Sequence, residues 1–145
     1  MPHYVDYAWV RDNCTALCAR DDVVLIDMLC TDAVGDILTR TFAACDAVIS
    51  SSIHGRVLAN AYGVPNVHFC VLTSGAIAGS VFKFRDYRSA FGLAAHDVFS
   101  LDANTTLEHA IAMVGAAVQV PADAVCQKQV ELLATIEQLR QIQKK

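Results

Sequence analysis

One unit near the middle of the chain most constrains its fold. Residues 46–49 form a short apolar, β-branched run, residues 50–55 form a polar turn, and residues 56–62 have the spacing of a helix. Gly63 closes that helix, and residues 66–72 form a second apolar run. Two buried strands joined by a helix form a βαβ unit, which predicts parallel strands covered by helices.

The same alternation of apolar runs and helical patterns continues on both sides of this unit. Residues 23–28 predict another strand covered on both faces, and residues 32–45 predict a helix from their apolar spacing. The remaining expectations are a small-residue loop at 75–80, a short helix at 82–91 ended by Gly92, a weak strand at 96–101, a helix from a capping box at Thr105 to about Val118, and a long helix at about 121–143 with Val125, Leu132, Ile136 and Leu139 on one face.

This alternation predicts the α/β class, with a Rossmann-like, doubly wound parallel sheet flanked by helices. The chain has 145 residues and shows no linker, repeat or low-complexity tract, which predicts a single domain over residues 1–145. A folded monomer of this mass, 15.7 kDa, exposes roughly 7,300 Å² and buries about two-thirds of its extended surface. The core is therefore large enough to need no disulfide or metal.

Composition excludes several classes of protein. A hydrophobic fraction of 54% with 18% charged residues excludes a disordered chain, and a net charge of −4 argues against a nucleic-acid partner. No apolar run reaches the roughly 18 residues of a spanning helix, and no leader pattern is visible, which predicts a cytoplasmic protein. The six cysteines form no CxxC pair and no metal-ligand cluster, so we expect buried thiols and no metal.

The opening residues resemble the end of a strand followed by a loop. The strand that would come before residues 1–6 is not in the sequence. This pattern predicts that Met1 is an internal start or that the chain is a fragment of a longer protein.

The turn after the strand at 46–49 is the candidate site. Ligands of open α/β sheets bind at the carboxyl ends of the strands, where helix N-termini offer free N–H groups to anions. Ser50, Ser51 and Ser52 would add hydroxyl donors, and Gly55 would let a ligand approach the backbone. His54 could protonate or hydrogen-bond a bound oxygen. The alternative is that the serines only cap the helix and His54 is a surface histidine.

A second cluster of charged residues follows at 83–88. Lys83 and Arg85 are candidate ligands for a carboxylate or phosphate, whereas we expect Arg88 to lie on a solvated helix face. The alternative for Lys83 and Arg85 is the same solvated face, with weak Arg–Asp pairing. We interpret His68 as a hydrogen-bonded histidine in a buried strand. His3 could approach the ligand side of the sheet from the end of a strand, but a lone loop histidine is more often structural.

Three ordered motifs in residues 1 to about 100 resemble the polysaccharide pyruvyl transferase family. They are Pro-His-Tyr-Val-Asp at 2–6, the run Asp-Ala-Val-Ile-Ser-Ser-Ser-Ile-His-Gly-Arg-Val-Leu-Ala-Asn-Ala-Tyr-Gly-Val-Pro at 46–65, and Lys-Phe-Arg-Asp-Tyr-Arg at 83–88. Members of this family have two Rossmann-like domains facing a cleft, as in GT-B glycosyltransferases. The resemblance implies that this chain is the C-terminal domain, with its last helix packed back toward the cleft.

The resemblance also implies a reaction. A pyruvyl group would move from phosphoenolpyruvate to two hydroxyls of a sugar or lipid-linked oligosaccharide in cell-surface polysaccharide synthesis, without cofactor or metal. His54 would be catalytic, and Ser50, Ser51, Ser52, Gly55, Lys83 and Arg85 would bind substrate. A separate N-terminal half, or self-association, would complete the cleft, and a lipid-linked acceptor would bring the chain to the inner membrane surface.

Two other functions stay open at this point. The chain could be a non-catalytic remnant or anion-binding module that lacks the other half of the cleft. It could also be a GT-B-like glycosyltransferase domain using a nucleotide sugar, although no glutamate occurs before Glu108 to hold a ribose.

Overall fold

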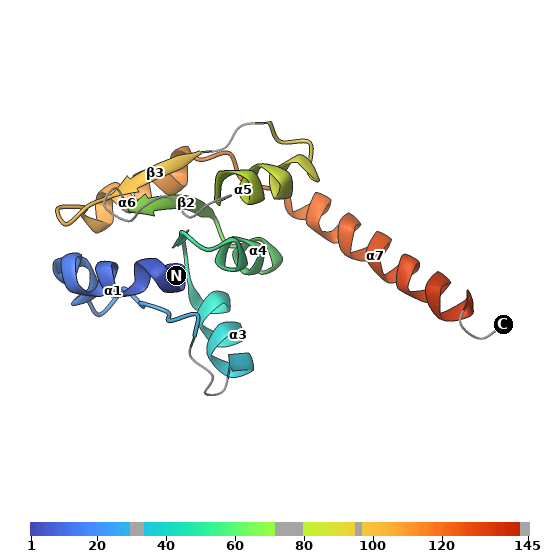
Figure 1. Ribbon diagram of the computed structural model, residues 1–145, viewed down its shortest axis with the longest axis horizontal. Helices are drawn as coiled ribbons and strands as arrows, with labels where there is room; N and C mark the ends of the chain where they lie inside the picture. The colour runs from blue at the N-terminus through green and yellow to red at the C-terminus, as the bar shows by residue number, and fades with distance from the viewer. Residues whose placement is uncertain (30–33, 72–79, 95–96, 143–145) are drawn as a thin grey trace.

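The computed structural model describes residues 1–29, 34–71, 80–94 and 97–142, and within them the chain is α/β (Figure 1). Three parallel strands lie in the order β1-β2-β3. Their bounds are β1 Val48–Ser50, β2 Asn66–Val71 and β3 Val98–Leu101. The helices are α1 Tyr4–Asn13, α2 Thr15–Cys18, α3 Val34–Ala44, α4 Ile53–Ala61, α5 Ser80–Ser89, α6 Leu107–Ala116 and α7 Ala122–Ile142.

Helices cover both faces of this sheet, as the apolar runs predict. Alternate residues of β2 point to opposite faces because side chains of a strand alternate. Val67, Phe69 and Val71 pack in one cluster with residues of α1, α2, β3 and α6. On the other face His68 stacks on Phe84 of α5, with ring centroids 3.7 Å apart. Within the described residues the strand order shows no reversal, so the doubly wound topology itself is not seen.

The βαβ unit at the centre of the sequence is confirmed. Strand β1 runs beside β2 with Ser50 opposite His68, and α4 connects them. The helix begins at Ile53, three residues before the expected start, and ends before Gly63, whose φ of +69° suits glycine. Three further predicted elements are confirmed with shifted ends: the helices at 32–45 and 82–91 and the strand at 96–101. Residues 32, 33, 96 and 75–79 of the predicted elements and loop lie outside the described residues.

The strand expected at 23–28 is wrong. This segment has no strand assignment and pairs with none of the three described strands. Val23 and Leu25 pack against the cluster around β2, whereas Ile26 packs against a second cluster around Phe42 of α3. Residues 23–28 are apolar because several of them pack against these two clusters, and this packing needs no pairing with a neighbouring strand.

The N-terminal segment also differs from its prediction. Only residues 1–3 are non-helical, and α1 begins at Tyr4, so residues 4–6 are the first turn of a helix and not a loop after a strand. Figure 1 shows the N-terminus in the middle of the molecule, beside α4. The segment is held there because the Met1 nitrogen donates to Ile49 O at 2.8 Å.

Two details at the C-terminal end are corrected. Helix α6 is capped by Thr106, whose side chain accepts from His109 N–H, while Thr105 Oγ1 instead binds Asp102. Helix α7 occupies 122–142 as predicted, but it runs away from the sheet (Figure 1) and only Val125 of its apolar face is buried. The molecule exposes 8967 Å², well above the roughly 7,300 Å² expected for a compact monomer of its mass, and the projecting α7 adds to this surface.

Candidate functional site

The turn between β1 and α4 lies at the carboxyl edge of the sheet, as predicted. Its three serines are all buried, and they have different environments. Ser50 Oγ lies 2.6 Å from Met1 O and 2.9 Å from Ser52 O, and it accepts from Ser52 N–H at 3.1 Å. The Ser50 hydroxyl is therefore used within the protein. It anchors the N-terminal segment and the turn, and is not available to a ligand.

The hydroxyl of Ser51 is also used within the protein. Ser51 Oγ donates to Asp6 Oδ2 at 2.6 Å and accepts from the His3 backbone N–H at 2.8 Å. Asp6 is 3% exposed, so this hydroxyl is the hydrogen-bond donor to a buried carboxylate. A buried charge needs such hydrogen bonds, which makes Ser51 a structural residue rather than a substrate ligand.

Ser52 is the N-cap of α4, but its side chain makes no capping hydrogen bond. Its Oγ is buried and has no hydrogen-bond partner among the described residues. A helix N-terminus exposes N–H groups and partial positive charge, and here a free hydroxyl stands at the same place. Of the three predicted serine ligands, Ser52 alone keeps its hydrogen-bonding capacity in the described structure.

His54 is exposed in the first turn of α4, where a ligand at the helix start could reach it. The role of Gly55 differs from the predicted one, which was to let a ligand approach the backbone. A Cβ at Gly55 would overlap Ser50 Oγ and lie 3.2 Å from Met1 Sδ. Gly55 is therefore needed for the close packing of α4 on β1 and the N-terminal segment, and its space is not open to a ligand.

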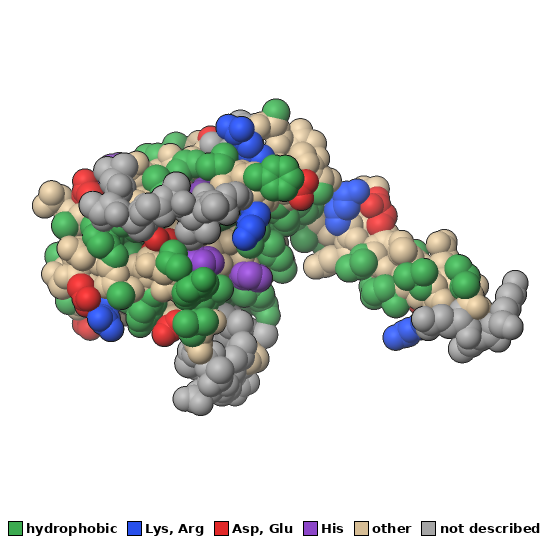
Figure 2. Space-filling view, viewed as in Figure 1, with side chains coloured by type: hydrophobic (Ala, Val, Ile, Leu, Met, Phe, Trp, Pro, Cys, Tyr) green, Lys and Arg blue, Asp and Glu red, His purple; other side chains and the backbone are tan. Residues whose placement is uncertain are grey.

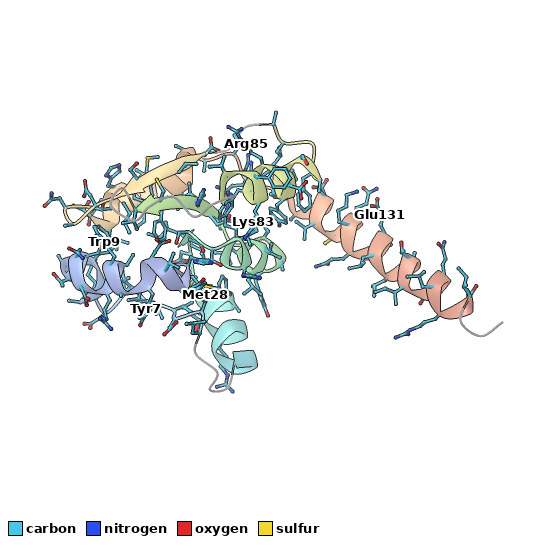
Figure 3. All side chains as sticks on the ribbon, viewed as in Figure 1. Tyr7, Trp9, Met28, Lys83, Arg85 and Glu131 are labelled. Carbon is cyan, nitrogen blue, oxygen red and sulfur yellow. The ribbon has the colours of Figure 1, made fainter. Side chains whose placement is uncertain are left out.

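Lys83 and Arg85 are both exposed on α5, but they lie on different sides of it. Figure 3 shows Lys83 on the side toward α4 and Arg85 on the opposite side. Residues two apart on a helix do not face the same way. The structure therefore brings Lys83 to the candidate site and leaves Arg85 away from it. The solvated position expected for Arg88 is wrong, because Arg88 is 1% exposed and its Nη1 donates to Val118 O at 2.8 Å.

His3 joins this site, although a structural role was expected for it. Burial lowers the pKa of His3, Asp6 raises it, and the nearby charges of Lys83 and His54 lower it further. His54 of α4 and Lys83 of α5 thus both lie within electrostatic reach of His3 in the N-terminal segment. Figure 2 shows two histidine side chains and a basic side chain gathered in the middle of the face in view, with apolar side chains around them.

The first turns of α4 also contain a buried arginine, Arg56. Arg56 is 2% exposed, and its Nε donates to Asn66 Oδ1 at 2.8 Å. Its guanidinium carbon lies 6.0 Å from the centre of the Phe84 ring. Burial, followed by the charge of Arg88, lowers the pKa of Arg56 to about 10. Sequence reasoning missed Arg56 and Asp6, because both sit on helix faces whose partners are distant in the sequence.

The cysteines of the described ranges form no disulfide and no metal site. Burial raises the pKa of Cys14 to about 11, so this thiol stays protonated and is a poor nucleophile. The five described cysteines are free, and Cys126 is exposed rather than buried. No group of three His, Cys, Asp or Glu side chains in the described residues could hold a metal ion. Among those residues, too, every helix is too short or too polar to pass through a lipid bilayer.

Comparison with known proteins gives a viral relative of part of the chain. The chain is similar to "Uncharacterized protein L143" of Acanthamoeba polyphaga mimivirus, at 36% identity over 94 residues. The match covers 64% of this chain and 31% of the viral protein, so the matched segment spans about a third of that relative. No family model and no solved structure matches the chain.

Proposed function

We propose that this chain is the donor-binding, C-terminal half of a transferase with the GT-B arrangement. It would move a pyruvyl group from phosphoenolpyruvate to a pair of sugar hydroxyls. The observation that carries this proposal is the start of α4, where the unpartnered hydroxyl of Ser52 is followed by exposed His54. His54 and Lys83 of α5 both lie within electrostatic reach of His3. The three motifs that resemble polysaccharide pyruvyl transferases contribute these residues.

The reaction has requirements that such a site could meet. One acceptor hydroxyl adds to C2 of the enol while a proton is added to C3, and the second hydroxyl then displaces phosphate from C2. The two hydroxyl protons balance the new methyl group and the released phosphate. In this scheme the α4 N-terminus and Lys83 hold the phosphate, and His54 transfers a proton.

In this proposal the site forms one wall of a cleft between two domains. A complete cleft excludes water and aligns acceptor with donor, and a second domain would supply the other wall. The same proposal locates the reaction in the cytoplasm, at the membrane surface when the acceptor is lipid-linked.

A titration of the ¹⁵N-labelled chain with phosphoenolpyruvate tests the donor site. We expect the amides of residues 50–56 to shift with a dissociation constant near 1 mM, about −4 kcal/mol, because half the contacts are absent. Binding should weaken with added salt, since exposed charges are screened over about 8–10 Å. Inorganic phosphate should compete, whereas pyruvate, which has no phosphate, should bind more weakly.

The variant His54→Ala separates binding from catalysis. In the complete enzyme it should lower ketal formation by about 10²-fold or more, as loss of an acid–base group does. His109→Ala, at another exposed histidine, is the matched control. Amides of 50–56 that stay still at tens of millimolar donor would contradict the donor site. Donor binding with undiminished turnover in His54→Ala would contradict the catalytic role, and binding without transfer would favour the anion-binding module.

A further inference from the structure

The serine run contains one unused hydroxyl. Those of Ser50 and Ser51 are bound to the N-terminal segment and Asp6, whereas Ser52 Oγ has no partner among the described residues. Ser52 is fully buried, so its hydroxyl is not satisfied by bulk water in this structure. A buried polar atom without a hydrogen bond costs about 1–3 kcal/mol, which argues for a partner that binds there.

A second unused atom belongs to His3. Its Nδ1 is also buried and without a hydrogen-bond partner in the described structure. The backbone of His3 is fixed next to the turn, because its N–H donates to Ser51 Oγ at 2.8 Å. The imidazole is further held against Tyr4, with ring centroids 4.4 Å apart. The position of this ring is therefore set by the fold, and its residue is tied to Ser51 in the turn that leads into α4.

The surrounding charges favour an anion. Lys83 and His54 contribute positive charge or donors from α5 and α4, and the N-terminus of α4 adds its partial positive charge. Asp6 is the acidic group facing His3, and its Oδ2 is already bound by Ser51. The two unpartnered buried atoms thus belong to residues beside a helix N-terminus, and Lys83 is the basic residue that acts on His3.

We infer that His3 Nδ1 and Ser52 Oγ bind the phosphate of the donor, and that His3 is thereby a substrate-binding residue of this site. This inference rests on the proposed function, because it assigns atoms to the donor named there. A neutral imidazole can present Nδ1–H to a phosphate oxygen, and a serine hydroxyl can donate likewise. Hydrogen bonds to a charged oxygen are shorter and stronger than neutral ones, particularly where water is excluded.

The test follows the His3 ring directly in the full chain. The ¹⁵N chemical shifts of the imidazole are recorded while phosphoenolpyruvate, inorganic phosphate or pyruvate is added in separate experiments. We expect the two phosphate-bearing ligands to shift His3 Nδ1 and to raise the pKa of His3, since a bound anion favours imidazolium. Pyruvate should leave both unchanged if the phosphate is the group recognised.

Two variants test the same assignment by affinity. Ser52→Ala and His3→Ala should each weaken phosphoenolpyruvate binding about 5- to 10-fold, as expected for one lost hydrogen bond to a charged group. His3→Asn, which keeps an amide near the Nδ1 position, should recover part of the loss. Ser89→Ala and His109→Ala, at exposed residues on α5 and α6, are the matched controls and should bind like the unchanged chain.

The outcomes separate this inference from the proposed function. Shifts of the 50–56 amides with an unmoved His3 ring and unchanged affinity in both variants would overturn the inference and leave the donor site standing. Absence of any shift in the unchanged chain would overturn both. A stronger response to pyruvate than to phosphate would assign His3 to the carboxylate and also overturn the inference.

Discussion

Ser51 and Asp6 are joined by a 2.6 Å hydrogen bond that ties the turn before α4 to the first turn of α1. The two residues are 45 positions apart in the sequence. The contact fixes the N-terminal segment beside the candidate site and places His3 there. The integrity of the site therefore depends on a serine that does not itself offer a hydroxyl to the ligand.

The first prediction compares neighbouring serines. Ser51→Ala should lower the free energy of unfolding by about 1–3 kcal/mol, because it takes a hydrogen bond from a buried carboxylate. Ser52→Ala should instead raise it, by up to about 1–3 kcal/mol, because alanine removes a buried hydroxyl that has no partner. Urea unfolding followed by circular dichroism measures both. Equal losses in the two variants would show that the serines are not used differently.

A second prediction concerns the packing of α4 on β1. Gly55→Ala should destabilise the fold by about 1–3 kcal/mol, because its Cβ would overlap Ser50 Oγ. Gly115→Ala in α6 is the control, since a Cβ there meets nothing within 4 Å. That variant should gain up to about 1 kcal/mol from helix propensity. Similar thermal midpoints for the two variants would contradict the close packing at Gly55.

The third prediction is a dependence of stability on pH. The pKa of His3 is lowered in the folded chain, mainly by burial, so the unfolded chain binds its proton more readily. The contribution of neutral His3 to the free energy of unfolding is complete above the ordinary histidine pKa of about 6.5. It is lost as the pH falls through the lower pKa that His3 has in the folded chain. Asp6, Lys83 and His54 are the charged groups acting on it, and Asp6 opposes the shift.

This dependence can be measured against a chain that lacks the imidazole. Between about pH 7 and pH 5 the unchanged chain should lose more unfolding free energy than His3→Asn, because asparagine does not titrate. An NMR titration should give His3 a pKa below 6.5 in the absence of ligand. Parallel stability curves for the two chains would mean that His3 makes no contribution.

A fourth prediction separates the core from α7. Leu101→Ala should cost about 2–5 kcal/mol, since this side chain is 1% exposed in the cluster under β2. Leu132→Ala should stay within about 0.5 kcal/mol, because Leu132 is 61% exposed and alanine favours helix. Denaturant midpoints measure both. A large loss in Leu132→Ala at low protein concentration would show that α7 packs on the body.

The βαβ unit could be predicted because its parts are local. A strand, a turn, a helix and a glycine stop follow each other without a gap, and each has its own sequence pattern. The run at 23–28 misled the prediction for a physical reason. A strand is defined by the neighbour it pairs with, whereas apolarity records only burial, and Val23 and Ile26 are packed against different clusters without such pairing.

The candidate site could be located from the sequence, but its atoms could not be assigned. Three adjacent serines look alike, and the one that stays open is decided by partners far away in the chain, at Met1 and Asp6. The amphipathic pattern of α7 has the same limit. It identifies an apolar face around Leu132 and Leu139 but not what covers it, and in the structure both side chains are exposed.

The attachment of the N-terminal segment to the turn at 50–52 has a consequence for the order of folding. Contacts between residues 1–6 and 50–52 close a long loop, and such contacts form late because the chain must lose much entropy before they are rewarded. A ligand that binds only the assembled turn would then select chains with the N-terminal segment docked and slow its local detachment. Amide hydrogen exchange in residues 4–10 should therefore become slower when ligand binds, although these amides lie outside the turn itself.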